Sequence, residues 1–229
     1  MRSITTIICI VLLLAGCGDK TPLTVDPGSE QKGRRYLALG DSYTIGESVE
    51  ERDRWPVLFA QAMNNRGRPV QNPYIIARTG WTTGDLLLAL TNFNPKENYD
   101  IVSLLIGVNN QYQGRSLEEY RVEFRELLLK SIAYAGGEPG QVFVLSTPDW
   151  GVTPFGIENR ETVEKEIDEL NAVAKAECDK EKVLFIDITS ISRRALNDPT
   201  LIARDNLHFS GKMHQLWVDE VFKNTKFRF

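Results

Sequence analysis

Five short apolar runs, rich in β-branched and aromatic residues, recur along the chain. They cover residues 36–39, 74–77, 101–106, 142–146 and 183–188. None of them alternates cleanly between polar and apolar positions, a pattern typical of strands that are buried on both faces of a sheet. We therefore expect these runs to form one sheet that is covered on both sides.

Segments with a helical spacing of apolar residues separate these runs. They cover residues 54–65, 83–91, 116–131, 159–177 and 211–223. Strands that alternate with helices predict an α/β fold, here a three-layer α/β/α sandwich with a five-stranded, mostly parallel, flavodoxin-like sheet. In such a sheet the functional loops lie at the carboxyl ends of the strands, near the point where the strand order reverses.

The beginning of the chain has the pattern of a secretory segment. Arg2 precedes an apolar run, residues 7–15, that is too short to span a bilayer as a stable anchor. The run leads into Ala15-Gly16-Cys17, which resembles the lipobox of bacterial lipoproteins. The resemblance implies cleavage before Cys17 and acylation of that residue, which would anchor the protein in a membrane. An ordinary secretory signal with an incidental cysteine and a buried N-terminal strand are the alternatives.

The domain organisation follows from this pattern. We expect residues 1–16 to be a lipoprotein signal peptide, residues 17–33 a lipidated cysteine with a flexible tether, and residues 34–229 one folded domain. Gly18, rather than aspartate, follows the cysteine, as expected for outer-membrane sorting in a diderm bacterium. The expected location is therefore the bacterial cell envelope, in the outer membrane or periplasm.

Charge and cysteine content exclude several kinds of partner. The formal net charge is -4 and no basic stripe occurs, so nothing in the sequence indicates nucleic-acid binding. The cysteines, Cys9, Cys17 and Cys178, have no spacing typical of a metal site. We expect neither a metal nor a cofactor.

Small and polar clusters follow four of the predicted strands. They are Gly40-Asp41-Ser42, Arg78-Thr79-Gly80-Trp81, Gly107-Val108-Asn109-Asn110 and, in a longer loop after the last strand, the segment from Asp205 to Gly211. Because the carboxyl ends of parallel strands share one edge of a sheet, these clusters are expected to meet in one cleft. Ester hydrolysis by serine needs a nucleophile, a base, a group that orients the base and donors for the oxyanion. The clusters contain residues suited to each of these roles.

In their order and content, the four clusters resemble the motif blocks of the SGNH, or GDSL-type, hydrolase family, and the resemblance extends from Arg34 to the C-terminus. It implies that Ser42 is the nucleophile, that His208 is the general base and that Asp205 orients the imidazole. It also implies an oxyanion hole formed by the backbone N–H groups of Ser42 and Gly80 and by the side-chain amide of Asn109. The implied activity is hydrolysis of carboxylic esters through an acyl-enzyme, without a metal.

The chain departs from the family pattern at Asn110, which stands where the third block usually has aspartate. Each motif residue also has a structural alternative. Asn109 suits a turn, Asp205 suits a solvated loop, and His208 suits the protein surface, where we also expect His214 on the last helix. The motif residues favour a catalytic site because they occur together, in order and at one edge of the predicted sheet.

The sequence predicts the substrate less closely than the reaction. The family resemblance implies small acyl esters, lysophospholipids, acyl thioesters or O-acetylated carbohydrates. We expect the loop that carries Trp150 and Phe155 to form one wall of the cleft and Trp81 to form another. Two hypotheses of a different class are a catalytically silent envelope lipoprotein that binds glycan or lipid in the same cleft, and a flavodoxin-like domain that binds a nucleotide cofactor.

Overall fold

The computed structural model describes residues 32–224, so the expected signal peptide, Cys17 and nearly all of the expected tether lie outside the described residues. It contains one sheet of five parallel strands in the order β2-β1-β3-β4-β5. The strands are β1 (Tyr36–Gly40), β2 (Tyr74–Ala77), β3 (Ile101–Leu105), β4 (Val142–Leu145) and β5 (Leu184–Ile186). The flavodoxin-like order and the α/β/α architecture predicted from the sequence are confirmed.

The helices form from the segments that separate the strands. The α-helices are α1 (Ser42–Ile45), α2 (Trp55–Asn65), α3 (Thr83–Ala89), α4 (Val108–Tyr112), α5 (Leu117–Tyr134), α6 (Arg160–Glu181), α7 (Thr189–Ser192) and α8 (Gly211–Asn224). Short 3-10 helices are η1 (Glu51–Asp53), η2 (Pro139–Gln141), η3 (Trp150–Val152), η4 (Ile157–Asn159), η5 (Arg193–Leu196) and η6 (Pro199–Leu201). The short helices α1, α4 and α7 were not predicted, because a helix of about one turn is too short to show a period of 3.6 residues.

The sheet is buried on both faces, as the unbroken apolar runs predict. Along β1, Leu37 and Leu39 contribute to one core cluster, whereas Tyr36 and Ala38 contribute to the other. Successive side chains of a strand point to opposite faces of the sheet. A central strand that is covered on both sides therefore needs apolar residues on both faces. The shortest strand, β5, ends at Ile186, and the carboxylate of the next residue, Asp187, accepts a hydrogen bond from the N–H of Thr189 at the start of α7 at 2.8 Å.

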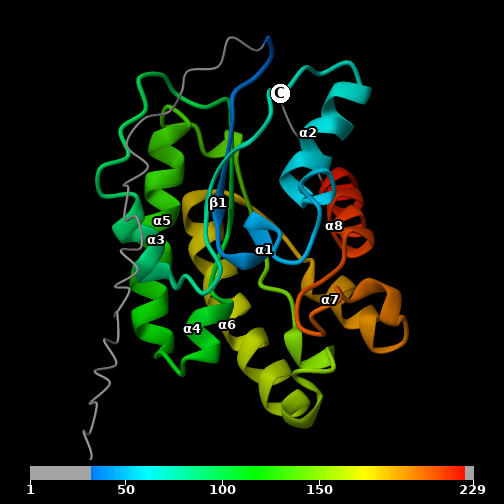
Figure 1. Cartoon of the computed structure of the whole chain (residues 1–229). Helices are drawn as coiled ribbons and strands as arrows, with labels where there is room; N and C mark the ends of the chain where they lie inside the picture. The colour runs from blue at the N-terminus through cyan, green and yellow to red at the C-terminus, as the bar shows by residue number, and fades with distance from the viewer. Residues whose placement is uncertain (1–31, 225–229) are drawn as a thin grey trace, which may run out of the picture.

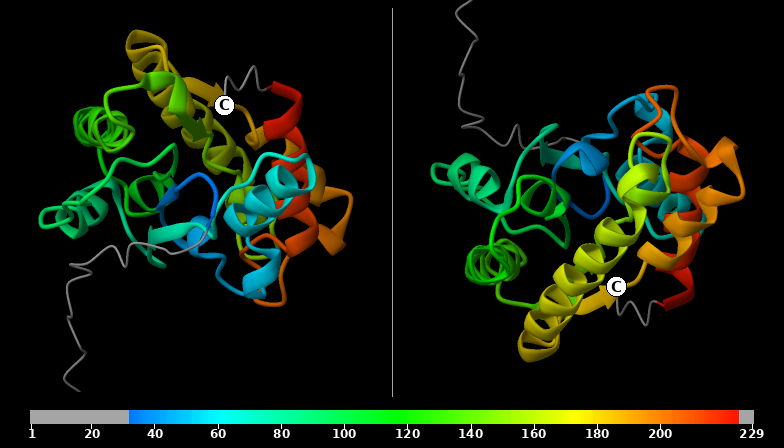
Figure 2. Two further views of the ribbon diagram at one scale, coloured as in Figure 1. Left: turned by 90° about the horizontal axis from the view of Figure 1, so that it is seen from above. Right: turned by 90° about the horizontal axis from the view of Figure 1, so that it is seen from below.

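Two groups of helices cover the sheet. In Figure 1, α3 and α5 lie on one side of β1, and α2 and α8 lie on the other. The views from above and below in Figure 2 keep α5 and α8 at opposite sides of the molecule. Their apolar side chains supply the two core clusters, with Phe124 and Leu127 from α5 in one cluster and Phe59 from α2 and Trp217 from α8 in the other. None of the helices in residues 32–224 is long and apolar enough to cross a membrane.

The strand order places a crevice between β1 and β3. These strands are neighbours in the sheet, and β2 pairs with the other edge of β1. The chain therefore leaves β1 and β3 towards opposite sides, which opens a space beyond their carboxyl ends. Gly40 and Leu105 are register partners, so the segments after the two strands begin at the same level. Those segments carry Ser42 and Asn109.

Candidate active site

Ser42 is the first residue of α1, just beyond the carboxyl end of β1. At Gly40 the chain passes so close to β3 that a Cβ atom would clash with the carbonyl oxygen of Leu105, so only glycine fits there. Asp41 then caps α1, because its carboxylate accepts a hydrogen bond from the backbone N–H of Tyr43 at 3.0 Å. The sequence Gly-Asp-Ser thus turns the chain sharply and leaves Ser42, only 4% exposed, on the wall of a cavity.

Gly80 and Asn109 belong to two loops that are tied together. The turn containing Gly80 is closed by a hydrogen bond from the N–H of Trp81 to the carbonyl of Arg78, and Gly80 has a φ of 85°, which residues with a Cβ atom rarely adopt. The side-chain amide of Asn109 donates one hydrogen bond to the carbonyl oxygen of Trp81 at 2.9 Å. An amide nitrogen carries two hydrogens, so one N–H of Asn109 remains as a donor.

Two backbone N–H groups lie in the same region. Within residues 32–224, the N–H groups of Ser42 and Gly80 donate to no protein acceptor. Ser42 stands at the N-terminus of a helix, where the first N–H groups have no partner inside the helix. Together with Asn109, these groups provide three hydrogen-bond donors around one cavity.

Asp205 and His208 form a closely bonded pair. The carboxylate oxygen Oδ2 of Asp205 lies 2.7 Å from His208 Nδ1, while Oδ1 accepts from the backbone N–H groups of Leu207 at 3.0 Å and His208 at 2.9 Å. Partial burial raises the pKa of Asp205, but the hydrogen bonds from Ser48, Leu207 and His208 outweigh this effect and hold the pKa well below its usual range. Asp205 is therefore a carboxylate at neutral pH, and it fixes the orientation of the imidazole.

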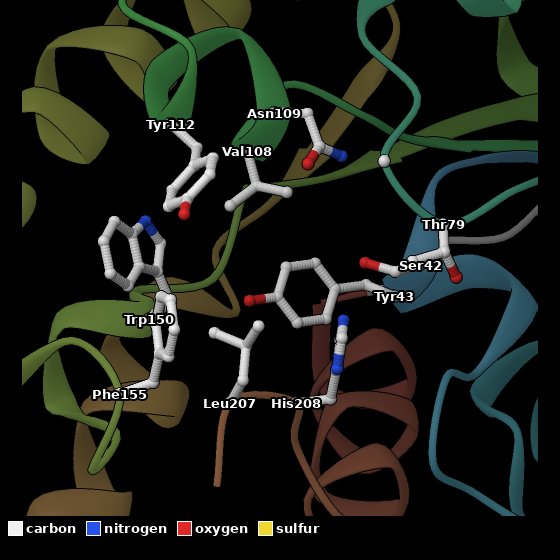
Figure 3. A pocket seen from close by; sticks show the side chains of 11 residues that line it. Ser42, Tyr43, Thr79, Val108, Asn109, Tyr112, Trp150, Phe155, Leu207 and His208 are labelled. Atoms are coloured by element: carbon white, nitrogen blue, oxygen red, sulfur yellow. The ribbon is translucent and has the colours of Figure 1, made fainter. Parts of the chain in front are cut away.

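His208 and Ser42 face the same space. Figure 3 shows both side chains pointing toward one end of the cavity. Because Nδ1 of His208 faces Asp205, Nε2 is the ring nitrogen that remains for other partners. No hydrogen bond joins Ser42 to His208 in the described part of the chain, and such catalytic hydrogen bonds are often formed only when substrate binds. Tyr43 packs edge-on against the imidazole, with ring centroids 5.7 Å apart, and restricts its rotation.

The cavity between these loops has a volume of about 180 Å³ and brings four of the five expected site residues together. They are Ser42, Gly80, Asn109 and His208, and Asp205 lies behind His208. The rest of the wall comes from Tyr43, Thr79, Val108, Tyr112, Trp150, Phe155 and Leu207. Among residues 32–224 no group of three or more His, Cys, Asp or Glu side chains is placed to hold a metal ion.

Aromatic side chains form the wall of the cavity opposite Ser42 (Figure 3). Trp150 is buried, whereas Tyr112 is 59% and Phe155 is 52% exposed at the rim. The ring centroid of Trp150 lies 5.5 Å from that of Tyr112 and 5.9 Å from that of Phe155. The expected wall from the Trp150 loop is present. Trp81, by contrast, packs against the core beside α3 and α5 and does not line the cavity.

The short helix α4 connects the site to its surroundings. Val108, Asn109 and Tyr112 line the cavity. The side chain of Gln111 accepts a hydrogen bond from the indole N–H of Trp150 at 2.7 Å, and so holds the aromatic wall in place. The helix α4 therefore supplies part of the cavity wall and also holds the aromatic wall that faces Ser42.

Asn110 has a structural role that explains the departure from the family pattern. It is buried beside α3, where its oxygen accepts from the N–H of Thr83 at 3.0 Å and its nitrogen donates to the hydroxyl of Thr83 at 2.6 Å. That hydroxyl then donates to a carboxylate oxygen of Glu123 at 2.5 Å. An aspartate at position 110 has no N–H to donate and would place a second carboxylate at the same hydroxyl. Asn110 therefore suits this position, because it donates to the Thr83 hydroxyl that in turn donates to Glu123 on α5.

His214 is not at the surface, as the sequence analysis expected, but is 1% exposed. Its ring stacks on Trp217, with centroids 4.7 Å apart, and Nδ1 accepts a hydrogen bond from the backbone N–H of Trp55 at 3.2 Å. Burial lowers the pKa of His214 to about 3. A neutral histidine enclosed between α2 and α8 has no access to the cavity, so His208 is the histidine of the site.

Two further residues, which were not predicted from the sequence, hold the site loops. Glu47 accepts a hydrogen bond from the hydroxyl of Thr79 at 2.5 Å, and Ser48 donates to Asp205 Oδ2 at 2.6 Å. Both lie a few residues after the Gly40-Asp41-Ser42 cluster, but nothing in their spacing indicates partners 32 and 157 residues away.

Asp41 is a buried carboxyl group beside the candidate nucleophile. It is 1% exposed. Burial raises its pKa to about 7, although hydrogen bonds from backbone N–H groups, that of Tyr43 first, act in the opposite direction. Its position at the cap of α1 gives it a structural role in the turn that carries Ser42.

Comparisons with known proteins identify the family and the fold. The sequence profile of the GDSL-like Lipase/Acylhydrolase family matches residues 38–216. An acetyl xylan esterase from Geobacillus stearothermophilus is similar in structure, with a TM-score of 0.67, 18% identity, and coverage of 86% of this chain and 97% of the other. A lipolytic protein of the G-D-S-L family from Veillonella parvula has a TM-score of 0.63 at 15% identity, covering 85% and 99%.

A lipase/acylhydrolase from Enterococcus faecalis has a TM-score of 0.61 at 22% identity, with coverage of 82% of this chain and 94% of that one. No curated protein is significantly similar in sequence. At these identities the solved structures show a shared fold, while the family profile extends over most of the described chain. The chain therefore belongs to the GDSL-like lipase/acylhydrolase family of carboxylic ester hydrolases.

Proposed function

We propose that this protein hydrolyses esters of short acyl groups, with Ser42 as nucleophile, His208 as general base and Asp205 as the residue that orients the base. One observation carries the proposal: the hydrogen-bonded Asp205–His208 pair and Ser42 meet at a cavity that Gly80 and Asn109 also line. These are the parts that acyl transfer by serine requires.

In the first step, His208 Nε2 takes the proton of Ser42 as Oγ attacks the carbonyl carbon of the ester. Asp205 holds Nδ1 and stabilises the imidazolium that forms. The negative charge that develops on the carbonyl oxygen is stabilised by the N–H groups of Ser42 and Gly80 and by the second N–H of Asn109. The imidazolium then gives its proton to the leaving alcohol, and an acyl-serine remains.

In the second step, His208 takes a proton from water, whose oxygen attacks the acyl-serine. The same three donors stabilise the second oxyanion, and collapse of the intermediate releases the acid and returns the proton to Ser42. The hydrogen bond from Asn109 to Trp81 fixes one of the donors and the turn that carries another. Such donors are effective because they need no rearrangement during the reaction.

Steady-state kinetics on p-nitrophenyl acetate and butyrate tests the assignment. Ser42→Ala and His208→Ala are expected to lower kcat by about a thousandfold or more. Asn109→Ala is expected to lower it by about a hundredfold, the usual cost of one oxyanion donor. Ser190→Ala, which changes an exposed serine on α7 outside the cavity, is the matched control and should be fully active.

A Ser42→Ala variant with wild-type activity would refute the assignment. Labelling with a fluorophosphonate probe distinguishes the hydrolase from a silent binding protein. The wild-type chain should be labelled at Ser42 and the Ser42→Ala variant should not, whereas a pure binding protein would remain unlabelled.

The size of the cavity supports a short acyl group. A volume of about 180 Å³ lies below the range of about 300–1,000 Å³ that is usual for ligand pockets. We propose that the acyl group enters this space and that the exposed rings of Tyr112 and Phe155 contact the alcohol portion of the ester. Flat aromatic surfaces at a rim suit the apolar face of an acetylated carbohydrate, and one structural neighbour is described as an acetyl xylan esterase.

An acyl-length series tests this proposal. Turnover of p-nitrophenyl esters should be highest for acetate to butyrate and should fall steeply at octanoate and beyond. Acetylated xylan fragments should be hydrolysed faster than a lysophospholipid with a long acyl chain. A preference for long acyl chains would contradict the proposal.

We further propose that Cys17 anchors the protein in a membrane of the bacterial cell envelope. The support is the sequence pattern Leu14-Ala15-Gly16-Cys17 behind a short apolar run.

A further inference from the structure

The segment directly after α1 contains a residue in an unusual conformation. Ser48 has a φ of 60°, in the left-handed region that residues with a Cβ atom adopt only at a cost. Asn and Asp tolerate this region better than serine, and glycine adopts it freely. A serine that remains in this conformation needs a reason, and strained residues often occur at functional sites.

The hydroxyl of Ser48 supplies that reason. It donates a hydrogen bond to Asp205 Oδ2 at 2.6 Å, and the same oxygen lies 2.7 Å from His208 Nδ1. The other three hydrogen bonds that Asp205 makes in the described chain come from its own loop, from the N–H groups of Leu207 and His208 and from the His208 ring. Ser48 is therefore the group that ties the carboxylate to the segment carrying Ser42.

This contact bears on the distance between the nucleophile and the base. Ser42 lies at the start of α1, and the N–H of Glu47, the neighbour of Ser48, donates to the carbonyl oxygen of Ser42 at 2.9 Å. The position of Ser48 is thus fixed relative to Ser42. Since Ser48 also holds Asp205, and Asp205 holds the imidazole, a chain of short hydrogen bonds runs from the nucleophile segment to the base.

We propose that Ser48 is a positioning residue for the hydrolytic reaction, which keeps the Asp205 carboxylate and, through it, the His208 imidazole in register with Ser42. The inference rests on the proposed function. Ser48 does not line the cavity, so its contribution concerns the arrangement of the reacting groups and not the binding of substrate.

Three substitutions at this position separate the hydroxyl from the backbone conformation. Ser48→Gly removes the hydroxyl and relieves the left-handed backbone, whereas Ser48→Ala removes the hydroxyl and keeps the unfavourable backbone. Ser48→Asn keeps a hydrogen-bond donor in a residue that tolerates this conformation. The Gly and Ala variants are expected to lose kcat about tenfold on p-nitrophenyl acetate, with KM within about twofold of wild type.

The melting temperature separates positioning from a purely structural role. The Tm of Ser48→Gly is expected to be about 2–4 °C above that of Ser48→Ala, although both have the same low kcat. Ser48→Asn should regain most of the lost kcat. A Ser48→Gly variant with wild-type kcat would overturn the proposal, because the reaction would then not need the Ser48 hydroxyl.

Lys182 provides the matched control, since it is exposed at the end of α6, away from the cavity, and has a φ of 59°. Lys182→Gly and Lys182→Ala should show the same difference in Tm with wild-type kcat. In an Asp205→Ala background, Ser48→Ala should cause no further loss of kcat, and an additional tenfold loss would also overturn the proposal.

The Ser42→Ala variant separates this inference from the proposed function. If Ser42→Ala is inactive and Ser48→Gly is fully active, only the positioning role is wrong. If Ser42→Ala is active, both the proposed function and the positioning role are wrong.

Discussion

Replacing Asp41 by asparagine is expected to stabilise the protein increasingly as the pH rises. The amide oxygen of asparagine can accept the hydrogen bond from the N–H of Tyr43, as the carboxylate does, so the cap of α1 is kept. The substitution removes the ionisation of a group that is 1% exposed and replaces one carboxylate oxygen by an amide nitrogen. Because that nitrogen is the same at every pH, the comparison of two pH values isolates the effect of the ionisation. Burial raises the pKa of Asp41 to about 7, from 3.8 for an exposed aspartate.

The sign and size of the effect follow from these two values. Between pH 3.8 and about 7 the unfolded chain has lost the proton while the folded chain keeps it. The folded state therefore binds more protons, and the free energy of unfolding decreases as the pH rises. The favourable contribution is complete below pH 3.8 and is lost by about pH 7. About three pKa units correspond to about 4 kcal/mol in total, of which about 2.5 kcal/mol falls between pH 5 and pH 8.

Urea unfolding at 25 °C, at pH 5 and at pH 8, measures this difference. The gain in unfolding free energy of Asp41→Asn over wild type should be about 2.5 kcal/mol larger at pH 8 than at pH 5. Asp198→Asn is the control. Hydrogen bonds from Thr200 and Lys212 lower the pKa of the exposed Asp198 to about 2, so its ionisation does not change between pH 5 and pH 8. A gain from Asp41→Asn that is the same at both pH values would refute the reasoning.

Three further predictions concern other parts of the molecule. Asn110→Asp is expected to lower the Tm by several degrees, because two carboxylates would then meet at one hydroxyl, and adding Glu123→Gln should restore most of it; an unchanged Tm in the single variant would contradict this. Phe155→Ala is expected to raise KM about fivefold for acetylated xylan fragments and less than twofold for p-nitrophenyl acetate in steady-state kinetics; equal changes would place the ring outside the alcohol side. Cys17→Ser is expected to move the protein from the membrane to the soluble fraction on cell fractionation; retention in the membrane would contradict the lipid anchor.

The features that the sequence predicted well are those encoded next to one another in the chain. An unbroken apolar run such as 101–106 identifies a buried strand without knowledge of its neighbours. Once the strands are parallel, the residues that follow them are brought to one edge by the geometry of the sheet. For this reason Ser42, Gly80, Asn109 and His208 were expected in one cavity, and the structure has them there.

The features that the sequence did not predict depend on contacts between distant segments. His214 lies beside apolar residues of α8, but only the backbone N–H of Trp55 on α2 explains why a histidine is buried there. The asparagine at position 110 is intelligible only with Glu123, thirteen residues further along the chain, in view. Ser48 acts on a residue 157 positions away. A local sequence pattern cannot predict these long-range contacts, because each residue by itself resembles an ordinary surface or loop residue.

The helix α4 has a consequence for how this enzyme can be adapted to new substrates. Its five residues, Val108 to Tyr112, serve several parts of the site at once: the cavity wall, a candidate oxyanion donor, the buried hydrogen bonds to Thr83 at the start of α3 and the hydrogen bond that holds Trp150. Each of the five residues has at least one of these roles, so α4 offers little room for gradual change. Phe155 at the rim is 52% exposed, and its ring packs against those of Tyr112 and Trp150. Libraries aimed at altered specificity should therefore vary the rim and leave the helix unchanged.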